Sequence, residues 1–486
     1  MRDDIKTRSL KGLVWATGES FGVALISLGS FVVLARLLSP QDFGIVALAT
    51  VFVYFCNVLT GHSFADVVVQ RPEMEGDHLD TAFWSTLAIA SALAAACLAG
   101  AGTLSLMLGE PALAGALRWL SLVPPLSALS SVQMALLRRG MRFDVVARVS
   151  LLGRAIGAML GIGMALAGFG FWSLIGQQLA GQAVMTAVFA AGPWRPRFRF
   201  SAQRLREMWA FGAQVSLNQV VTGATEQTFN LLIGTFFGAT VLGYFTLAWR
   251  AVQLVKSLIS SAVYHVGLSA FSRLQQDRQA LVEAFLNATR ISCLVGFPIA
   301  IGIALVAEPL VVGAFDEQWR RSIPLLSLMA LELIPTFYGV FLSALYRAMD
   351  RAAWGLAMAV AYAVVGLGGA LAVAPYGIEA MVAVWVGRAF LLMPLHVMLL
   401  HHLLAVPYKR LAGPVVAPLA AAAVMAGGLA VMGLALPALP PLATLVLLAA
   451  VGAIVYAAGI RLVSPPLFGL ALRTAGRAVA STPKAP

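Results

Sequence analysis

Seven charged or amide side chains inside long apolar runs of the sequence are candidates for a functional site. Ionisable groups are costly within a bilayer, so each one is a functional hypothesis by default. The candidates for substrate binding are Arg154, Arg250, Arg388, Lys256 and Gln253, and the candidates for coupling or gating are Glu226 and Glu332. Arginine suits phosphate because its planar fork donates paired hydrogen bonds. The residue types predict recognition of an anion.

Glu226 and Arg250 are expected at similar depth. With a rise of 1.5 Å per residue, Glu226 lies about 14 Å before the end of its helix and Arg250 about 15 Å into the next. Only residues 236–240 join these helices, so the two side chains are expected to meet near the midplane. Two interpretations fit equally well: a buried structural ion pair, or part of a site. Gln253 extends the polar stripe of Arg250, whereas Lys256 lies about 120° away and could instead extend toward the cytoplasm.

Arg154, Glu332 and Arg388 are also expected near mid-depth. Neither arginine has an acid at matching depth within its own helical hairpin. We therefore expect both to face a water-filled cavity. Prolines interrupt four of the helices and permit kinks, because each removes a backbone hydrogen bond. They are Pro124 with Pro125, Pro298, Pro335 and Pro394.

The apolar runs themselves set the fold class. The chain has 486 residues, of which 60% are hydrophobic and 11% charged, whereas about a quarter of a soluble domain is charged. Such runs predict spanning helices, because a helix satisfies its own backbone hydrogen bonds in hydrocarbon. The sequence predicts an all-α, polytopic integral membrane protein whose first run stays as an anchor. Cys56, Cys97 and Cys293 show no pair or metal spacing and are expected to be small buried hydrophobes.

We predict about fourteen spans, whose connecting links alternate between short and basic. The spans are 12–35, 43–66, 83–108, 114–137, 145–168, 170–192, 208–235, 240–268, 287–313, 322–346, 354–375, 378–402, 411–436 and 440–462. Counted with the span ends beside them, the tails and even-numbered links hold 25 of the 33 Lys and Arg residues, and the odd-numbered links hold four. Positive residues stay on the cytoplasmic side, so both termini are predicted there. The net charge of +12 is therefore a topology signal and not evidence of nucleic-acid binding.

Two patterns recur in the second half of the chain. Residues 35–49 return as 234–248, an offset of 199, and the motif Ala135-Leu-Leu-Arg138 with Arg142 returns after 209 residues as Ala344-Leu-Tyr-Arg347 with Arg351. Six spans separate the copies, so both run in the same direction, which predicts a pseudo-twofold axis along the membrane normal. The predicted domains are an N-lobe (1–192), a linker (193–207), a C-lobe (208–405), and two extra spans with a tail (406–486).

The linker 193–207 alternates arginine with Trp and Phe. Its rings could lie in the headgroup layer while its guanidinium groups meet anionic phosphates. An ordinary inter-lobe linker that carries a topology signal explains it equally well. Elsewhere, no lysine follows a glycine as in a phosphate-binding loop, and no histidine precedes a glutamate as in a zinc protease motif. The sequence supports neither an enzyme nor an ATP-driven pump.

Several segments together resemble one family. They are A-R-L-L-S-P-Q-D-F-G, R-R-G-M-R-F-D-V-V-A-R-V-S-L-L-G-R, G-F-G-F-W-S-L-I-G-Q-Q-L, W-R-P-R-F-R-F-S and F-S-R-L-Q-Q-D-R, within residues 8 to 405. The chain is similar to the polysaccharide transporter branch of the multidrug/oligosaccharidyl-lipid/polysaccharide (MOP) superfamily. The resemblance implies two six-helix lobes around a central cavity, two extra helices, and location in the bacterial inner membrane. It implies a flippase for undecaprenyl-diphosphate-linked oligosaccharide in exopolysaccharide, capsule or O-antigen synthesis.

The resemblance also implies membrane lipids and polysaccharide polymerase or export machinery as partners, and no cofactor beyond an H⁺ or Na⁺ coupling ion that the sequence does not decide. Family members often carry an acid just before the Leu231-Leu-Ile-Gly234 motif, where this chain has Asn230. Glu226 lies one turn earlier and could substitute for it.

Two other functions are considered. A multidrug antiporter of the MATE type would favour an acidic cavity, but the five ionisable residues nearest mid-depth are three Arg and two Glu. A polysaccharide polymerase would need a long outer loop, and the longest outer link is about 314–321.

Overall fold

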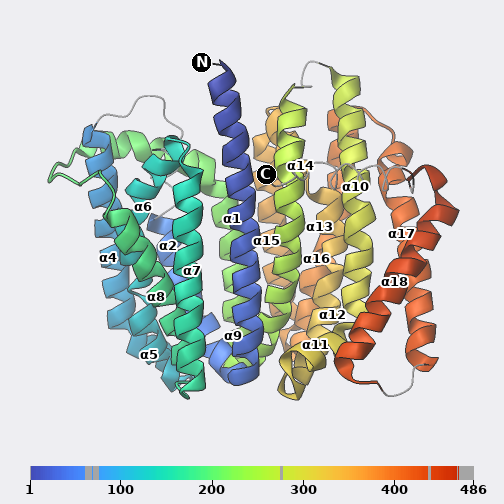
Figure 1. The fold of residues 1–486 in the computed structure, drawn as a ribbon, viewed down its shortest axis with the longest axis horizontal. Helices are drawn as coiled ribbons and strands as arrows, with labels where there is room; N and C mark the ends of the chain where they lie inside the picture. Colours follow the sequence, from blue (N-terminus) through green and yellow to red (C-terminus); the bar gives the residue numbers. More distant parts are fainter. Residues whose placement is uncertain are drawn as a thin grey trace, which may run out of the picture. The chain divides into compact units, whose positions relative to one another are not determined.

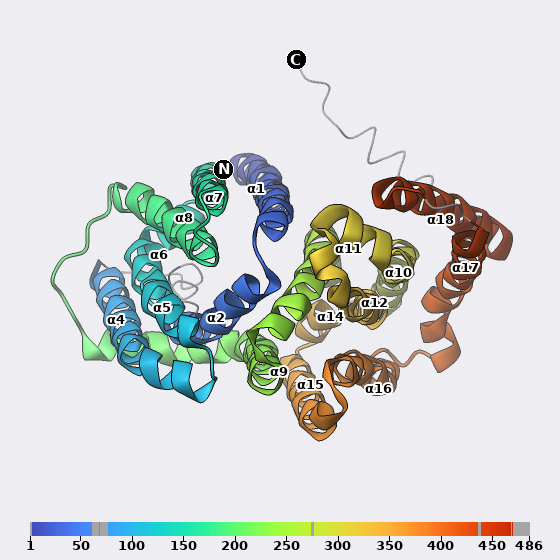
Figure 2. The same ribbon diagram turned by 90° about the horizontal axis from the view of Figure 1, so that it is seen from below.

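The computed structural model describes the backbone of residues 2–60, 68, 76–273, 277–435, 439–467 and 469. Every regular element within these residues is a helix, as Figures 1 and 2 show from two directions. Their apolar length explains this, because only helices or closed barrels satisfy all backbone polar groups in hydrocarbon. The protein is an all-α, multi-pass membrane protein, as predicted.

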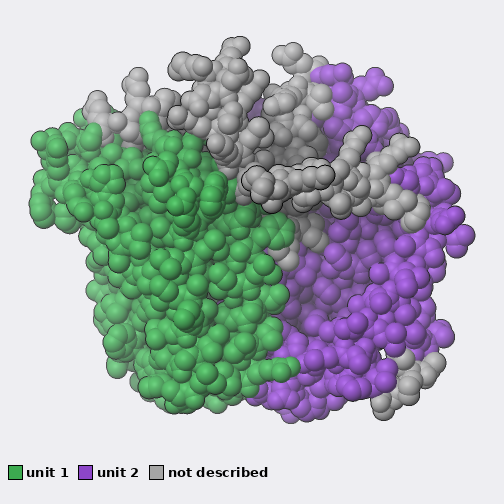
Figure 3. All heavy atoms as spheres, viewed as in Figure 1, with its two compact units in different colours: residues 1–246 green, residues 247–486 purple. Residues whose placement is uncertain are grey.

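The chain divides into two compact units, residues 1–246 and 247–486, which Figure 3 colours separately. The first unit holds α1 (Arg2–Leu37), α2 (Pro40–Thr60), α4 (Gly76–Met107), α5 (Pro111–Leu120), α6 (Val123–Arg139), α7 (Phe143–Leu166), α8 (Trp172–Ala190) and α9 (Ala202–Arg273) as far as Thr246. The second holds the rest of α9, then α10 (Arg278–Leu305), α11 (Ala307–Phe315), η1 (Glu317–Ser322), α12 (Ile323–Leu331), α13 (Leu333–Gly339), α14 (Leu342–Ala348), α15 (Ala352–Val373), η2 (Ala374–Tyr376), α16 (Ile378–Leu404), α17 (Tyr408–Ala435) and α18 (Pro441–Val463).

Twelve helical stretches among the described residues are long and apolar enough to span a membrane. One of them, Val220–Ser257, contains the turn between the predicted seventh and eighth spans, at Gly238, whose backbone is not helical (φ 81°, ψ 173°). Helix α8 covers the predicted sixth span but is not among the twelve, and it carries three glutamines. The count of fourteen spans stays a prediction.

The repeated motif near Arg138 and Arg347 forms the same turn in each unit. Met141 and Asp350, which are 209 residues apart, both have φ 55°. In each turn the next residue donates its N–H to the carbonyl five residues earlier, from Arg142 to Leu137 (2.9 Å) and from Arg351 to Tyr346 (2.7 Å). This is a Schellman helix end. The sequence repeat therefore appears locally as a repeated backbone geometry.

The other repeated segment makes a reciprocal contact inside the first unit. A Cβ added to Gly44 would overlap the backbone of Ala239, and a Cβ added to Gly243 would overlap the backbone of Pro40. The offset of 199 relates Gly44 to Gly243 and Pro40 to Ala239. Each copy thus presents the same glycine to the same position of the other, as in a contact across a twofold axis.

This contact shifts the boundary between the compact units. The first unit extends to Thr246, beyond the predicted linker at 193–207. Besides the glycine contacts, the Glu110 carboxylate accepts a hydrogen bond from the N–H of Ala239 (3.0 Å). The first half of α9 therefore belongs by its contacts to the unit that precedes it.

The predicted linker is tied to the start of α4. The N–H of Arg197 donates to Asp80 (3.0 Å), the Trp84 indole donates to the Arg197 carbonyl (2.8 Å), and Arg199 pairs with Asp77 (3.1 Å). Phe198 stacks on Trp84 with 4.7 Å between ring centroids and is 91% exposed. Both interpretations of this segment, headgroup-layer binding and ordinary linker, stay open.

The structure adds detail to two local predictions. Cys56 and Cys293 are buried as predicted and Cys97 is half-buried, and the sulfur atoms of Cys56 on α2 and Cys97 on α4 lie 3.6 Å apart as free thiols. Sequence spacing could not reveal this contact between helices. The prolines also differ from one another: Pro298 and Pro394 lie inside continuous helices, whereas Pro124 with Pro125 and Pro335 accompany true breaks.

The reciprocal glycine contact gives a stability prediction. Gly44→Ala and Gly243→Ala should each lower the melting temperature of the purified protein, because overpacking at a backbone contact costs about 1–3 kcal/mol. Thermal unfolding in detergent measures the change.

Gly102→Ala is the matched control, since nothing lies within 4 Å of the Cβ that this helical glycine would gain. An alanine there should be neutral or stabilising. Equal melting temperatures for all three variants would show that the glycine contact does not constrain the fold.

Candidate functional site

Glu332 lies where the tenth predicted span is broken. It separates α12 from α13, and its N–H bonds the Met329 carbonyl three residues back (3.1 Å). Pro335 causes the break, because it has no N–H to donate to the carbonyl of Leu331, four residues earlier. The predicted proline interruption therefore occurs, and it places a carboxylate at the break.

Arg388 of α16 reaches Glu332 from another helix. Its Nη2 lies 3.7 Å from Glu332 Oε1, and both side chains are buried, at 9% and 8% exposure. Its Nη1 donates to the Trp385 carbonyl (2.6 Å), and its guanidinium lies 3.2 Å from the centroid of the Trp385 ring. This is a stacked cation–π contact. Gly366 of α15 makes room for the arm, since a Cβ there would lie 2.7 Å from Arg388 Cδ.

Lys256 of α9 is the second cation at the same carboxylate. Its Nζ lies 3.5 Å from Glu332 Oε1, and its side chain is 18% exposed. The ammonium also lies 5.9 Å from the centroid of Trp249, whose ring is 6.2 Å from that of Trp385. Lys256 therefore points to Glu332 and does not extend to the membrane surface.

We call Lys256, Glu332 and Arg388 the triad. Lys256 and Arg388 share one carboxylate oxygen of Glu332. The formal charge of the triad is therefore +1 when all three groups are ionised. Oxygen Oε2 of Glu332 is buried and has no hydrogen-bond partner among the described residues. Removing one partner of a buried ion pair costs about 3–5 kcal/mol, because the other charge is left without compensation. Because its net charge is positive, the triad can attract an anion.

The placement of Arg388 corrects one expectation. Arg388 was predicted to face a water-filled cavity, but it is buried. The reason is its ion pair with Glu332, which lies in a different helical hairpin, whereas the prediction considered only acids in the hairpin of Arg388 itself. The Tyr362 ring, whose centroid lies 5.9 Å from the Arg388 guanidinium, belongs to this site together with Trp385, Trp249 and Gly366. The sequence did not indicate any of these four residues as candidates. Only Trp385 had a usable signal, since it precedes Arg388 by three residues and thus shares its helix face.

Arg154 behaves differently, because it is exposed. The residues one turn away on its face of α7, Ser150, Gly157 and Ala158, are buried. The exposed apolar residues of α7, including Leu152 and Met159, point to roughly the opposite side of the helix. Arg154 thus keeps an accessible guanidinium on the packed face of its helix, in keeping with a wet surface inside the first unit.

The remaining candidates are placed but not joined into a site. Glu226 is half-buried and Arg250 exposed; they fall in different units, so their pairing stays a prediction. The Tyr54 hydroxyl packs against Gly223, one turn before Glu226. Gln253 is half-buried on α9. Among the described residues, no group of three or more His, Cys, Asp or Glu side chains could hold a metal ion.

Comparison with known proteins extends these observations. A solved structure of the lipid II flippase MurJ in an inward closed conformation matches with a TM-score of 0.75 at 14% identity, covering 93% of this chain and 99% of that one. A multidrug resistance MATE family transporter of the MOP superfamily, facing inward, matches with a TM-score of 0.54 at 19% identity over 80% of this chain and 94% of its own. These likenesses establish the fold.

Sequence comparison identifies the family. The succinoglycan biosynthesis transport protein ExoT of Rhizobium meliloti (strain 1021) is 30% identical over 326 residues, which are 67% of this chain and 65% of ExoT. ExoT and the two structural neighbours are described as transport proteins or flippases, not enzymes. The model of the family described as polysaccharide biosynthesis protein matches residues 33–324. The chain therefore belongs to the polysaccharide biosynthesis protein family and has the fold of MOP-superfamily transporters.

Proposed function

We propose that this protein is a flippase that moves undecaprenyl-diphosphate-linked oligosaccharide from the cytoplasmic to the periplasmic leaflet of the bacterial inner membrane. The observation that carries the proposal is the positively charged triad, in which Lys256 and Arg388 face a single acid, Glu332. Fixed cations offset the cost of taking a diphosphate out of water. Arg154 adds an accessible cation in the first unit.

The substrate sets the other requirements. Each sugar hydroxyl costs several kcal/mol in hydrocarbon, so the headgroup needs a polar path through the protein. The lipid tail can remain in the bilayer while the headgroup crosses by alternating access. With a negative cell interior, outward movement of about two negative charges is favoured by roughly 5 kcal/mol per 100 mV. Coupling to H⁺ or Na⁺ through Glu226 or Glu332 would add to this force.

The charges of these residues favour the flippase over the alternative function, a MATE-type antiporter. A MATE-type exporter of organic cations would be served by unpaired acids at its site. In the triad the only carboxylate is already shared by two cations, and Arg154, the exposed candidate residue of the first unit, is also a cation. The distribution of Lys and Arg supports both termini in the cytoplasm.

Transport measurements on two arginine variants test the proposal. Arg388→Gln and Arg154→Gln should each slow translocation of a fluorescent lipid-linked oligosaccharide in proteoliposomes by about tenfold or more, because charge-assisted hydrogen bonds to the diphosphate contribute about 1.5–3 kcal/mol. Both variants should fold, since Lys256 still neutralises Glu332 and Arg154 has no ion-pair partner among the described residues. Arg388→Lys should recover only part of the rate, because lysine lacks the bidentate fork.

Arg148→Gln is the matched control on α7, since Arg148 is exposed and pairs with Asp144 near the start of the helix. It should translocate at the wild-type rate. Wild-type rates in both Arg154→Gln and Arg388→Gln would remove the proposed phosphate site.

Glu332→Gln tests the triad as a charge network. The substitution keeps the shape of the side chain but removes the acid that two buried cations share, so the melting temperature should fall markedly. The double variant Glu332→Gln/Arg388→Gln should be more stable than the single Glu332→Gln variant, because it removes one uncompensated charge. Thermal unfolding of the four members of this double-mutant cycle gives the coupling. Strictly additive effects would show that the two side chains do not interact.

A further inference from the structure

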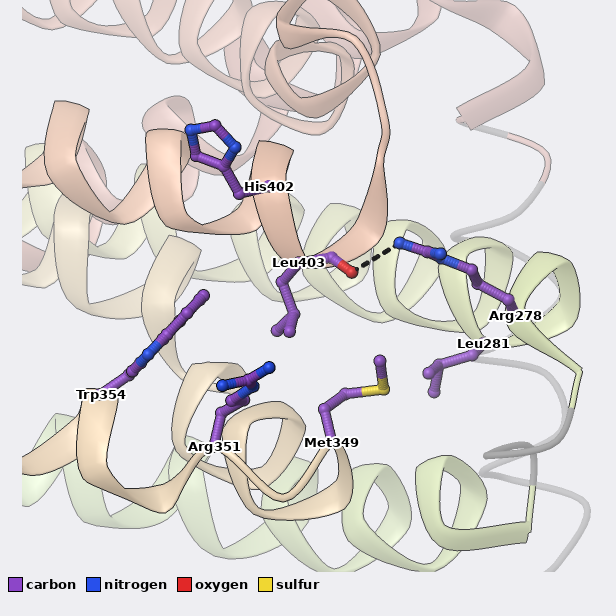
Figure 4. Close-up of a pocket in the computed structure, with 7 residues that line it drawn as sticks. All are labelled: Arg278, Leu281, Met349, Arg351, Trp354, His402 and Leu403. Carbon is purple, nitrogen blue, oxygen red and sulfur yellow. Dashed lines mark hydrogen bonds between the residues drawn. The ribbon is translucent and has the colours of Figure 1, made fainter.

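The second unit contains a basic pocket that takes no part in the triad. Its volume is about 380 Å³, and three segments line it: the start of α10 with Arg278 and Leu281, the turn before α15 with Met349, Arg351 and Trp354, and the end of α16 with His402 and Leu403. Figure 4 shows both guanidinium groups turned toward the middle of the pocket. Pockets of about 300–1,000 Å³ typically hold small molecules or headgroups.

The charge of the pocket lining is one-sided. Two arginines and a histidine line it together with apolar side chains, and no carboxylate of the described residues does. Arg278 donates one Nη2 hydrogen bond to the Leu403 carbonyl (2.8 Å), which fixes the arm while other donors of its fork remain. The Arg351 guanidinium lies 5.7 Å from the centroid of Trp354. The two side chains are thus held in place by a neutral carbonyl and a ring, not by acids.

The internal repeat shows that this arrangement is specific to the second unit. Arg142, the counterpart of Arg351 in the first unit, pairs with Asp144 at 3.3 Å. The position that corresponds to Asp144 after 209 residues is Ala353. Among the described residues, neither Arg278 nor Arg351 has a carboxylate within ion-pair distance.

The acids that are nearest in sequence to Arg278 and Arg351 do not neutralise them. Asp277 precedes Arg278, but its carboxylate caps α10 by accepting the Ala280 N–H (2.9 Å). Asp350 precedes Arg351 and is exposed in the left-handed turn. Neither lines the pocket.

The location of the pocket suggests the kind of anion. All three segments lie at or beside the ends of helices long enough to span a membrane, Arg278–Leu305, Ala353–Tyr376 and Ile378–Leu404. Helix ends of this kind lie at the level of lipid headgroups, where tryptophan is also favoured. Arginine recognises phosphate through paired, charge-assisted hydrogen bonds.

We propose that this pocket binds a lipid-borne phosphate at the membrane surface. Arg278 and Arg351 hold the phosphate oxygens, and Trp354, Met349 and Leu281 contact the adjoining glycerol or alkyl carbons. The proposal stands independently of the proposed function, because the pocket and the triad share no residue.

Native mass spectrometry of the full chain tests the site, with phosphatidylglycerol as the probe in detergent. The variant Arg278→Gln/Arg351→Gln should retain at least fivefold less bound phosphatidylglycerol than the wild type. Arg351→Gln alone should also lose lipid, and within the described part of the chain the Arg351 side chain makes no hydrogen bond that this change would break. Met349→Trp should reduce binding while both arginines remain, because it fills the pocket.

The control Arg321→Gln/Arg461→Gln removes the same charge from two exposed arginines of the second unit outside the pocket. It should bind phosphatidylglycerol like the wild type. Equal lipid retention in the pocket and control variants, or unchanged binding in Met349→Trp, would overturn the site in favour of diffuse surface attraction.

Competition distinguishes the two sources of lipid phosphate. Farnesyl diphosphate added at the same concentration should leave phosphatidylglycerol bound if the site serves phospholipid, and should displace it if the site serves polyprenyl diphosphates. Either result supports a phosphate site. Failure of both probes to bind the wild type would refute it, whatever the transport rate.

Discussion

The site depends on the ion pairs that the buried carboxylate of Glu332 forms with Lys256 and Arg388. An isolated charge in a low-dielectric interior is prohibitively costly, so each of the three groups needs the others. The local backbone serves this need: Pro335 breaks the span where Glu332 must turn inward, and Gly366 leaves space for Arg388. The sum of charges remains positive, which is the property that an anionic headgroup requires.

The proposed function gives this network a second role. A diphosphate that binds Lys256 and Arg388 competes with Glu332 for the same donors. Substrate binding would then place a like charge beside Glu332. The same network can therefore both hold the headgroup and respond to its arrival.

Much of the scaffold follows from the sequence, because hydrophobic length and turn chemistry act locally. The apolar runs predicted the helices, and the motif at Arg138 and Arg347 predicted a repeat that the structure shows as two turns with φ 55° at Met141 and Asp350. Pro335 was predicted to interrupt its span because a missing N–H acts within one turn. The similarity to ExoT and the match to the family model then confirmed the polysaccharide biosynthesis family that the sequence motifs had indicated.

The site was harder to predict because its contacts join distant helices. Arg388 and Glu332 are 56 residues apart, and no periodicity relates them. The same holds for Cys56 with Cys97, and for the ties between the arginine-rich linker and α4. Candidate residue types could be chosen by the cost of burying them. Which ones pair, and which one stays accessible like Arg154, depends on helix rotation and tertiary packing that one sequence does not specify.

The central claim is that fixed cations select a phosphate-bearing lipid, and substrate discrimination by the wild-type protein tests it most directly. Translocation rates in proteoliposomes should be compared for one oligosaccharide attached to a polyprenyl lipid through a diphosphate and through a neutral ether. The account predicts that the diphosphate form crosses at least tenfold faster and that a positive-outside potential accelerates it. Equal rates for the charged and neutral lipids, insensitive to the potential, would contradict it.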